Sequence, residues 1–170
     1  MKRKLDYSRV EIDTIKFFKH RCKGITIKWS SPDIGFGEYT LYKKLEENSK
    51  WKADSEYMDW KDDTLFGQTL FEYLIEHVKV KTRGGTKMKK DLDLTDLKIV
   101  DIDCYVDEED REEGMIITWQ SPTLGSGEYN FYKNIDSDKW MIDSEFIDDN
   151  DDKQFGKELL MKFLEMCEIE

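Results

Sequence analysis

Two sets of acidic residues at matching positions are the strongest candidates for chemistry in this sequence. Glu38, Asp54 and Glu56 form the first set. If the segments that carry them pair as an antiparallel hairpin, their side chains share one face, because alternate residues of a strand point to the same side. Three clustered carboxylates can differ in pKa, so that one acts as a general acid and another as a general base, or they can bind a divalent cation. The second set, in the same arrangement, comprises Glu128, Asp143 and Glu145.

The competing interpretation of these carboxylates is a solvated sheet face whose acids pair with lysines such as Lys28. No histidine lies beside either set, and His20 and His77 belong to no metal-binding or nucleophile motif. We therefore predict a protein without catalytic residues, cofactor or metal site, and not an enzyme. A carboxylate-dependent hydrolase or nuclease is the alternative hypothesis.

Two other segments of the sequence resemble ligand-binding loops. Residues 31–37 read Ser-Pro-x-x-Gly-x-Gly, but a strand-like segment at 38–42 follows them, whereas a phosphate loop opens a helix. Residues 134–138, with Glu145 in the twelfth position, imitate an EF-hand loop but lack its first Asp and its Gly. We predict turns between strands in both places.

The elements that position these residues come from an internal repeat. Residues 24–32 recur ninety residues later as 114–122, and the match continues through the helical segments at the end of each copy. Alternating apolar residues predict strands, including first strands at 12–18 and 99–106, and apolar stripes predict helices over 66–78 and 155–167. The fold class is α+β, a tandem duplication of a ββββα unit that has an antiparallel sheet and one C-terminal helix per repeat.

A basic segment divides the two copies. We predict a first repeat at 1–78, a linker at 79–95 and a strongly acidic second repeat at 96–170. Whether the repeats pack together, and whether the chain forms oligomers, is left open by the sequence. The linker offers a secondary basic contact through Lys81, Arg83, Lys87, Lys89 and Lys90.

Charge is distributed very unevenly along the chain. The net charge is −11, yet residues 1–90 hold 20 Lys and Arg against 14 Asp and Glu, while residues 91–170 hold 7 against 24. The loop at 19–23 is basic and its counterpart at 107–113 is acidic. Since both connect equivalent strands, we expect the scaffold not to explain the reversal, which leaves either drift in a solvated loop or selection for different partner contacts. The predicted partner-binding residues are Asp107, Glu108, Glu109, Asp110, Glu112, Glu113, Asp148, Asp149, Asp151 and Asp152.

The sequence also indicates the cellular compartment of the protein. The N-terminal residues 1–6 run directly into charged sequence, and no stretch is long and apolar enough to cross a bilayer. Cys22, Cys104 and Cys167 have no CxxC spacing, which indicates reduced thiols. We expect a cytoplasmic protein without membrane contact.

The pattern GxGEYxxYK followed by KWxxDSE and an aromatic residue, present at 35–57 and 125–146, resembles small proteins of phages and mobile elements. In its acidic character the chain is similar to anti-CRISPR and anti-restriction inhibitors. This resemblance implies a non-enzymatic inhibitor in the cytoplasm of the host cell, and no functional residues carry over from it.

The leading hypothesis is therefore an inhibitor whose acidic C-terminal repeat imitates a nucleic-acid backbone and blocks the basic site of a nucleic-acid-binding protein, such as a nuclease effector. Direct nucleic-acid binding by that half is not expected. A toxin-neutralising immunity protein is the second binding hypothesis.

Overall fold

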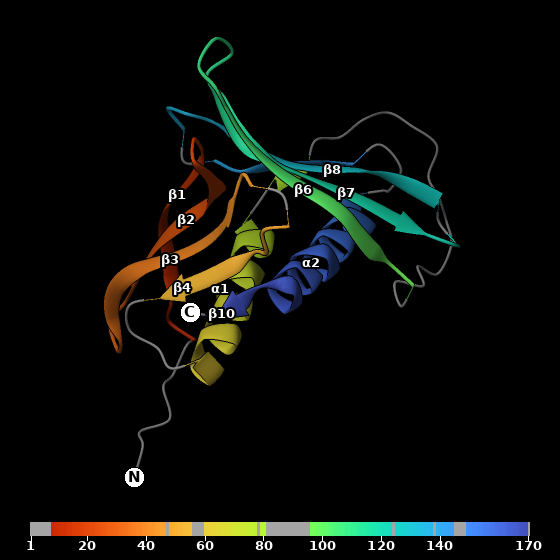
Figure 1. The fold of residues 1–170 in the computed structure, drawn as a ribbon. Helices are drawn as coiled ribbons and strands as arrows, with labels where there is room; N and C mark the ends of the chain where they lie inside the picture. Colours follow the sequence, from red (N-terminus) through yellow and green to blue (C-terminus); the bar gives the residue numbers. More distant parts are fainter. Residues whose placement is uncertain are drawn as a thin grey trace.

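The structure of the chain, a computed structural model, describes residues 8–46, 48–55, 60–77, 79–80, 96–123, 125–137, 139–144 and 149–169. Each repeat forms four antiparallel strands followed by a helix, which confirms the predicted α+β duplication (Figure 1). The first repeat contains β1 (Glu11–Lys19), β2 (Cys22–Ser31), β3 (Gly35–Lys44), β4 (Lys52–Ser55) and α1 (Trp60–His77). The second contains β6 (Lys98–Asp107), β7 (Glu112–Ser121), β8 (Gly125–Asn134), β9 (Met141–Ser144) and α2 (Asp149–Met166).

Each sheet has a fifth, short strand, which follows the helix of the other repeat. After α1 the chain forms β5 (Lys79–Val80), which pairs in parallel with β9 of the second sheet. After α2 it forms β10 (Glu168–Ile169), which pairs in parallel with β4 of the first sheet. The segment predicted as a linker thus begins with a strand of the second sheet, and its remainder, 81–95, lies outside the described residues.

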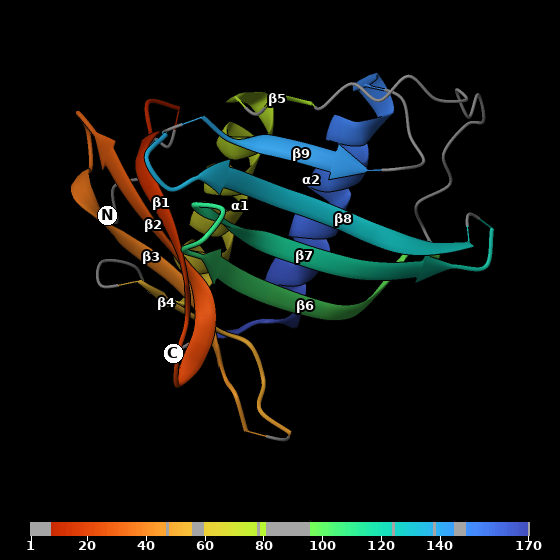
Figure 2. The same cartoon turned by 90° about the horizontal axis from the view of Figure 1, so that it is seen from above.

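A single hydrophobic core joins the two repeats. The inward positions of the strands follow the predicted alternation, and Ile25, Ile27 and Trp29 are fully or almost fully buried. Across the repeat boundary, the ring of Trp51 packs edge-on against Phe163 of α2, with 4.8 Å between the ring centroids. The helices α1 and α2 lie side by side, the first sheet lies beside α1, and the second sheet covers α2 (Figures 1 and 2). The repeats therefore stabilise each other through shared apolar burial.

The glycine-containing runs are turns, as predicted. Gly35 has φ of 112° and Gly125 has φ of 98°, a left-handed conformation that glycine adopts without steric cost. In both turns the buried serine hydroxyl, of Ser31 or Ser121, accepts a backbone N–H two residues later. Because a strand and not a helix follows each turn, the phosphate-loop alternative does not apply.

Within the described chain, neither α1 nor α2 combines the length and the apolar character that a helix needs to cross a membrane.

Candidate functional site

The acidic loop predicted as the partner contact forms the tip of the β6–β7 hairpin, which projects at the top of Figure 1. The Asp107 carboxylate closes this tip by accepting the backbone N–H groups of Glu109 and Asp110, at 3.0 and 3.1 Å. Arg111 follows with φ of 53°, so the chain turns sharply into β7. Asp107 thus shapes the tip that carries its neighbours.

A pair of charge-assisted hydrogen bonds fixes the tip against the adjacent turn. Arg111 donates from Nε and Nη2 to the two carboxylate oxygens of Asp136, at 2.8 and 2.7 Å. These bonds lower the pKa of Asp136, and the backbone N–H of Ile135 donates to the Arg111 carbonyl oxygen at 2.8 Å. The bidentate geometry restricts the orientation of the tip.

Two of the predicted contact residues already have partners within the repeat: Glu113 in the interior and Glu112 on the outward face. The carboxylate of Glu113 is 3.2 Å from Lys133 Nζ, and both side chains are buried, at 7% and 6% exposure. The Lys133 ammonium also lies over the Trp140 ring, 5.4 Å from its centroid. Glu112 accepts a 2.7 Å hydrogen bond from the Tyr105 hydroxyl, and burial together with this bond raises the pKa of Tyr105. The Glu113 carboxylate is therefore buried with its partner and not available to another protein.

The surface of the acidic tip is therefore smaller than predicted. Glu108, Glu109 and Asp110 remain exposed around the turn. Asp149, Asp151 and Asp152 lie in the first turn of α2, but the structure does not describe their side chains. The remaining predicted contact residues lie outside the described residues: Asp148, Lys81, Arg83, Lys87, Lys89 and Lys90.

The basic tip of the first repeat has a structural role that the sequence comparison did not predict. Lys19 Nζ is 3.0 Å from the carboxylate of Asp103 on β6, and Lys23 Nζ is 3.4 Å from it. Partial burial acts to raise the pKa of Asp103, but hydrogen bonds and charges from both lysines lower it. The expectation that scaffold requirements play no part in the charge reversal is thus wrong, because Lys19 and Lys23 join the repeats and Glu113 neutralises Lys133.

The outward face of the second sheet extends the acidic surface beyond the tip. Asp101 and Asp103 alternate along β6 with the buried Ile102 and Cys104, and therefore point outward. The strand registers align Asp103 with Lys16 of the first repeat. They likewise align three uncharged residues of the second repeat, Thr118, Asn134 and Met141, with Lys28, Lys44 and Lys52 of the first. The outward acids of the second sheet are Asp101, Asp103, Glu112, Glu128 and Asp143, of which Asp103 is paired with Lys19 and Lys23 and Glu112 is bonded to Tyr105.

Sequence reasoning missed the contribution of Asp101 and Asp103, although their alternation with apolar residues was visible. The acids stood out in the loops, where they occur in runs, and not within a strand, where every second residue is apolar. The resulting surface combines an exposed tip with a face on which the described outward residues of β6 to β9 include one base, Lys98, at the far end.

In both carboxylate sets the described members lie on the outward face of the sheet, as predicted: Glu38, Asp54, Glu128 and Asp143. Asp54 lies opposite Thr40 in the β3–β4 pair, on the same face as Glu38. Glu38 pairs with Lys28 at 3.5 Å, in agreement with the solvated-face interpretation. Glu56 and Glu145 lie outside the described residues, which contain no group of three or more His, Cys, Asp or Glu able to hold a metal ion.

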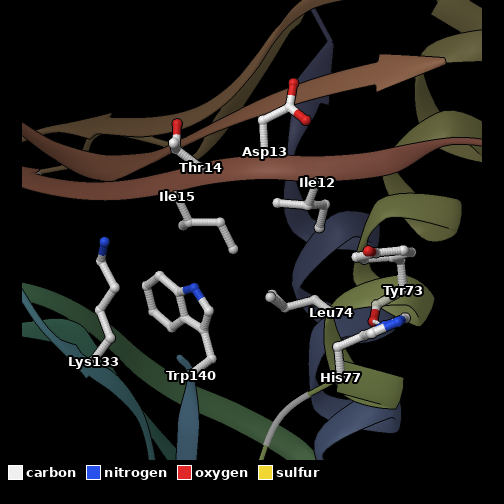
Figure 3. Close-up of a pocket in the computed structure, with 9 residues that line it drawn as sticks. All are labelled: Ile12, Asp13, Thr14, Ile15, Tyr73, Leu74, His77, Lys133 and Trp140. Atoms are coloured by element: carbon white, nitrogen blue, oxygen red, sulfur yellow. Dashed lines mark hydrogen bonds between the residues drawn. The ribbon is translucent and has the colours of Figure 1, made fainter. Parts of the chain in front are cut away.

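A hollow of about 220 Å³ lies between the repeats, bounded by β1, α1 and the β8–β9 connection (Figure 3). Ile12, Ile15 and Leu74 point into it, and Trp140 forms its floor beside Lys133. Asp13, one of its lining residues, points away from it toward β2, where Ser30 donates to the Asp13 carboxylate. Polar groups do not converge on this space, so its geometry favours packing between the repeats over chemistry.

The rim of the hollow carries two stacked rings of α1. Tyr73 and His77 lie with centroids 4.0 Å apart, and His77 Nδ1 is 2.8 Å from the Tyr73 carbonyl oxygen, to which it donates. Burial, followed by the charges of Glu11 and Asp13, raises the pKa of Tyr73. A tyrosine held protonated in this way is a poor base.

Comparison of the chain with protein-family models, with curated proteins and with solved structures gave no match. Its function is therefore inferred from the charges and contacts of the molecule itself.

Proposed function

We propose that this chain is a non-enzymatic binding protein that inhibits a partner by covering the partner's basic, nucleic-acid-binding surface. The observation that carries the proposal is the charge difference between two copies of one scaffold. Four outward positions that hold lysine on the first sheet hold aspartate or an uncharged residue on the second, and the exposed tip of the second repeat adds three further acids.

Rigid presentation supports a role in recognition. Glu108, Glu109 and Asp110 sit on a tip that the Asp107 cap and the Arg111–Asp136 pair hold in one geometry. Less side-chain and loop freedom is then lost on binding, which favours affinity. Carboxylates spaced along strands and a hairpin are complementary to the Lys and Arg groups that neutralise phosphates in nucleic-acid-binding proteins.

The partner that fits this surface is a basic protein that binds DNA or RNA. A nuclease effector of a defence system has this chemistry, and its inhibition agrees with the resemblance to anti-CRISPR and anti-restriction inhibitors. The inhibitor acts by competition, since partner cations cannot contact phosphates and these carboxylates together.

The test is capture from nuclease-treated host lysate on the immobilised full chain. One variant removes the tip charges (Glu108→Gln, Glu109→Gln, Asp110→Asn), and a second removes face charges (Asp101→Asn, Glu128→Gln). The matched control removes three exposed acids elsewhere (Asp54→Asn, Glu76→Gln, Glu165→Gln). Capture is compared at about 50 and about 200 mM salt, because contacts between exposed charges weaken with ionic strength.

We expect the wild type and the control to capture the same nucleic-acid-binding protein at low salt, and the tip variant to lose it. The purified partner must then release labelled nucleic acid when the wild type is added. Capture that is equally strong with the tip and face variants contradicts the proposal. A captured toxin whose activity is neutralised without competition for nucleic acid indicates an immunity protein instead.

A further inference from the structure

The outward face of the first sheet carries a feature that the acidic surface of the second repeat does not explain. Phe18 on β1 and Tyr42 on β3 both lie opposite Gly24 of β2, in one row across three strands. We call Phe18 and Tyr42 the ring pair. Both residues point away from the core and are half-buried, not fully exposed. Solvent-facing rings on a sheet are unusual unless they pack on something.

The lack of a side chain at Gly24 leaves space for the Phe18 ring in this row. A Cβ atom at this position would lie 2.6 Å from Phe18 Cζ and 2.2 Å from the Leu41 carbonyl oxygen. The Phe18 ring therefore reaches across β2 toward the β3 side, where Tyr42 stands. Without a side chain between them, the two rings form one shallow apolar strip on the sheet.

Cations surround the ring pair. Lys16 is two residues from Phe18 on the same face, Lys44 is two residues from Tyr42, and Lys52 lies opposite Tyr42 on β4. Arg21 is exposed at the adjacent turn. Lys16 and Lys44 are also exposed. Two acids lie near these cations on the same face: Asp54, opposite Thr40, and Glu168 of β10, which is opposite Lys52 and paired with Lys50.

The second repeat provides the same row without these lysines, and its Arg111, which is equivalent to Arg21, is paired with Asp136. Tyr105, Gly114 and Tyr132 occupy the equivalent positions, and Tyr105 covers Gly114 as Phe18 covers Gly24. Here the neighbours of the rings are Asp103 and Glu112. Scaffold packing therefore accounts for the aromatic row in both repeats, but not for the lysines around one of them.

We infer that the ring pair and its cations form a binding site for single-stranded nucleic acid. Bases stack on aromatic side chains of a sheet with little dependence on sequence, while Lys and Arg beside the rings contact the phosphates. The charge around the ring pair is complementary to a phosphodiester strand, and the acids around the second row exclude one. This activity belongs to the first repeat and is independent of the acidic surface proposed to bind a protein partner.

The test is fluorescence anisotropy with the purified full chain and labelled mixed-sequence strands of about 16 nucleotides, as RNA, as DNA and as a DNA duplex. One variant removes the rings (Phe18→Leu, Tyr42→Leu), and its matched control makes the same change in the second row (Tyr105→Leu, Tyr132→Leu). A further variant, Lys16→Gln with Lys44→Gln, alters only exposed side chains and so leaves folding intact. Thermal unfolding of each variant checks that it is folded.

We expect saturable binding of single strands at about 50 mM salt, with weaker binding of the duplex. The ring variant should lose affinity by about fivefold or more for each ring, the lower end of a stacking contribution, and the control should retain it. Loss of two phosphate contacts should reduce the slope of log affinity against log salt by about 1.4 in the lysine variant. A preference between the RNA and DNA arms identifies the natural strand.

Several results would overturn the site. One is the lack of saturable binding by the wild type, and another is equal loss of affinity in the ring variant and its second-row control. A duplex that binds as tightly as the single strand would show that bases do not stack on the rings. Displacement by poly-glutamate as effective as by unlabelled strand would assign the lysines to an acidic protein. If the ring variant does not fold, the test rests on the lysine variant alone. An unchanged slope of log affinity against log salt in that variant then overturns the site.

Discussion

Lys23 in the first repeat and Glu113 in the second occupy the same place in the same scaffold, at the start of the second strand, yet they form different contacts. Glu113 pairs within its own sheet with the buried Lys133. Lys23 lies opposite another lysine, Lys43, and its ammonium contacts Asp103 of the other repeat. One ion pair is internal to a repeat, and the other joins the two repeats.

This difference shows that a charge reversal between duplicated units has two separate causes. Where the reversed residue is buried or joins the repeats, as with Lys19, Lys23 and Glu113, the fold uses the charge. Where it is exposed and has no counterpart in the other repeat, as with Glu108 and Glu109, recognition of a partner is the use that we propose for it. Only the second kind is a target for mutations meant to change binding alone.

Separating the two repeats should have the largest effect. We expect fragments 1–80 and 81–170, each produced alone, to lack a cooperative unfolding transition, because Trp51 loses Phe163 and β4 loses β10. A shared core accounts for most of the stability of a domain, typically about 5–15 kcal/mol. Near-ultraviolet circular dichroism during urea titration measures this, and mixing the fragments should restore the transition. A cooperative transition in either fragment alone would show that the repeats fold independently.

Removing the buried charge of Glu113 should have the next largest effect. Glu113→Gln leaves the Lys133 ammonium buried without its partner, which should lower the free energy of unfolding by about 3 kcal/mol. Lys23→Gln at the equivalent, more exposed pair should cost less than about 1 kcal/mol. Urea unfolding of both variants gives the comparison. Joint replacement of Glu113 and Lys133 by methionine should recover most of the loss, and equal costs for the two single variants would contradict the distinction.

The smallest expected effect concerns the contact between the repeats at Asp103. Its pKa is lower in the folded state than in the unfolded chain, where it is about 3.9. Its stabilisation is therefore fully present above about pH 4 and decreases as the pH falls toward the folded-state pKa. Asp103→Asn should cost less than about 1 kcal/mol at neutral pH, since the pair is partly exposed.

Unfolding measurements on the wild type and Asp103→Asn between neutral and acidic pH test this expectation. The two stability curves should converge below about pH 4. A difference that stays constant across that range would show that the substitution acts through packing rather than through the charge of Asp103.

The sequence by itself determined the architecture of each repeat and its turns. Strand alternation, such as Ile25 and Ile27 inward with Thr26 outward, and the glycine at position 35 reflect local geometry that nearby residues impose. The duplication strengthened the prediction of these strands and turns, because a pattern present twice at the same spacing is not accidental. For the same reason Glu38 and Asp54 were assigned correctly to one face of the first sheet.

Only the tertiary structure decided how the repeats combine and which charges remain available. The exchange of β5 and β10 and the contact of Lys19 with Asp103 join residues far apart in the chain, so no local pattern encodes them. Whether Glu113 is exposed or buried depends on Lys133 and Trp140, which reach it through the β7–β8 pairing and the packing around that pair. The local geometry of a strand repeats every two residues, whereas burial and charge pairing depend on the approach of distant segments. The acidic loop could therefore be found in the sequence. Which of its acids are structural and which are exposed could not be.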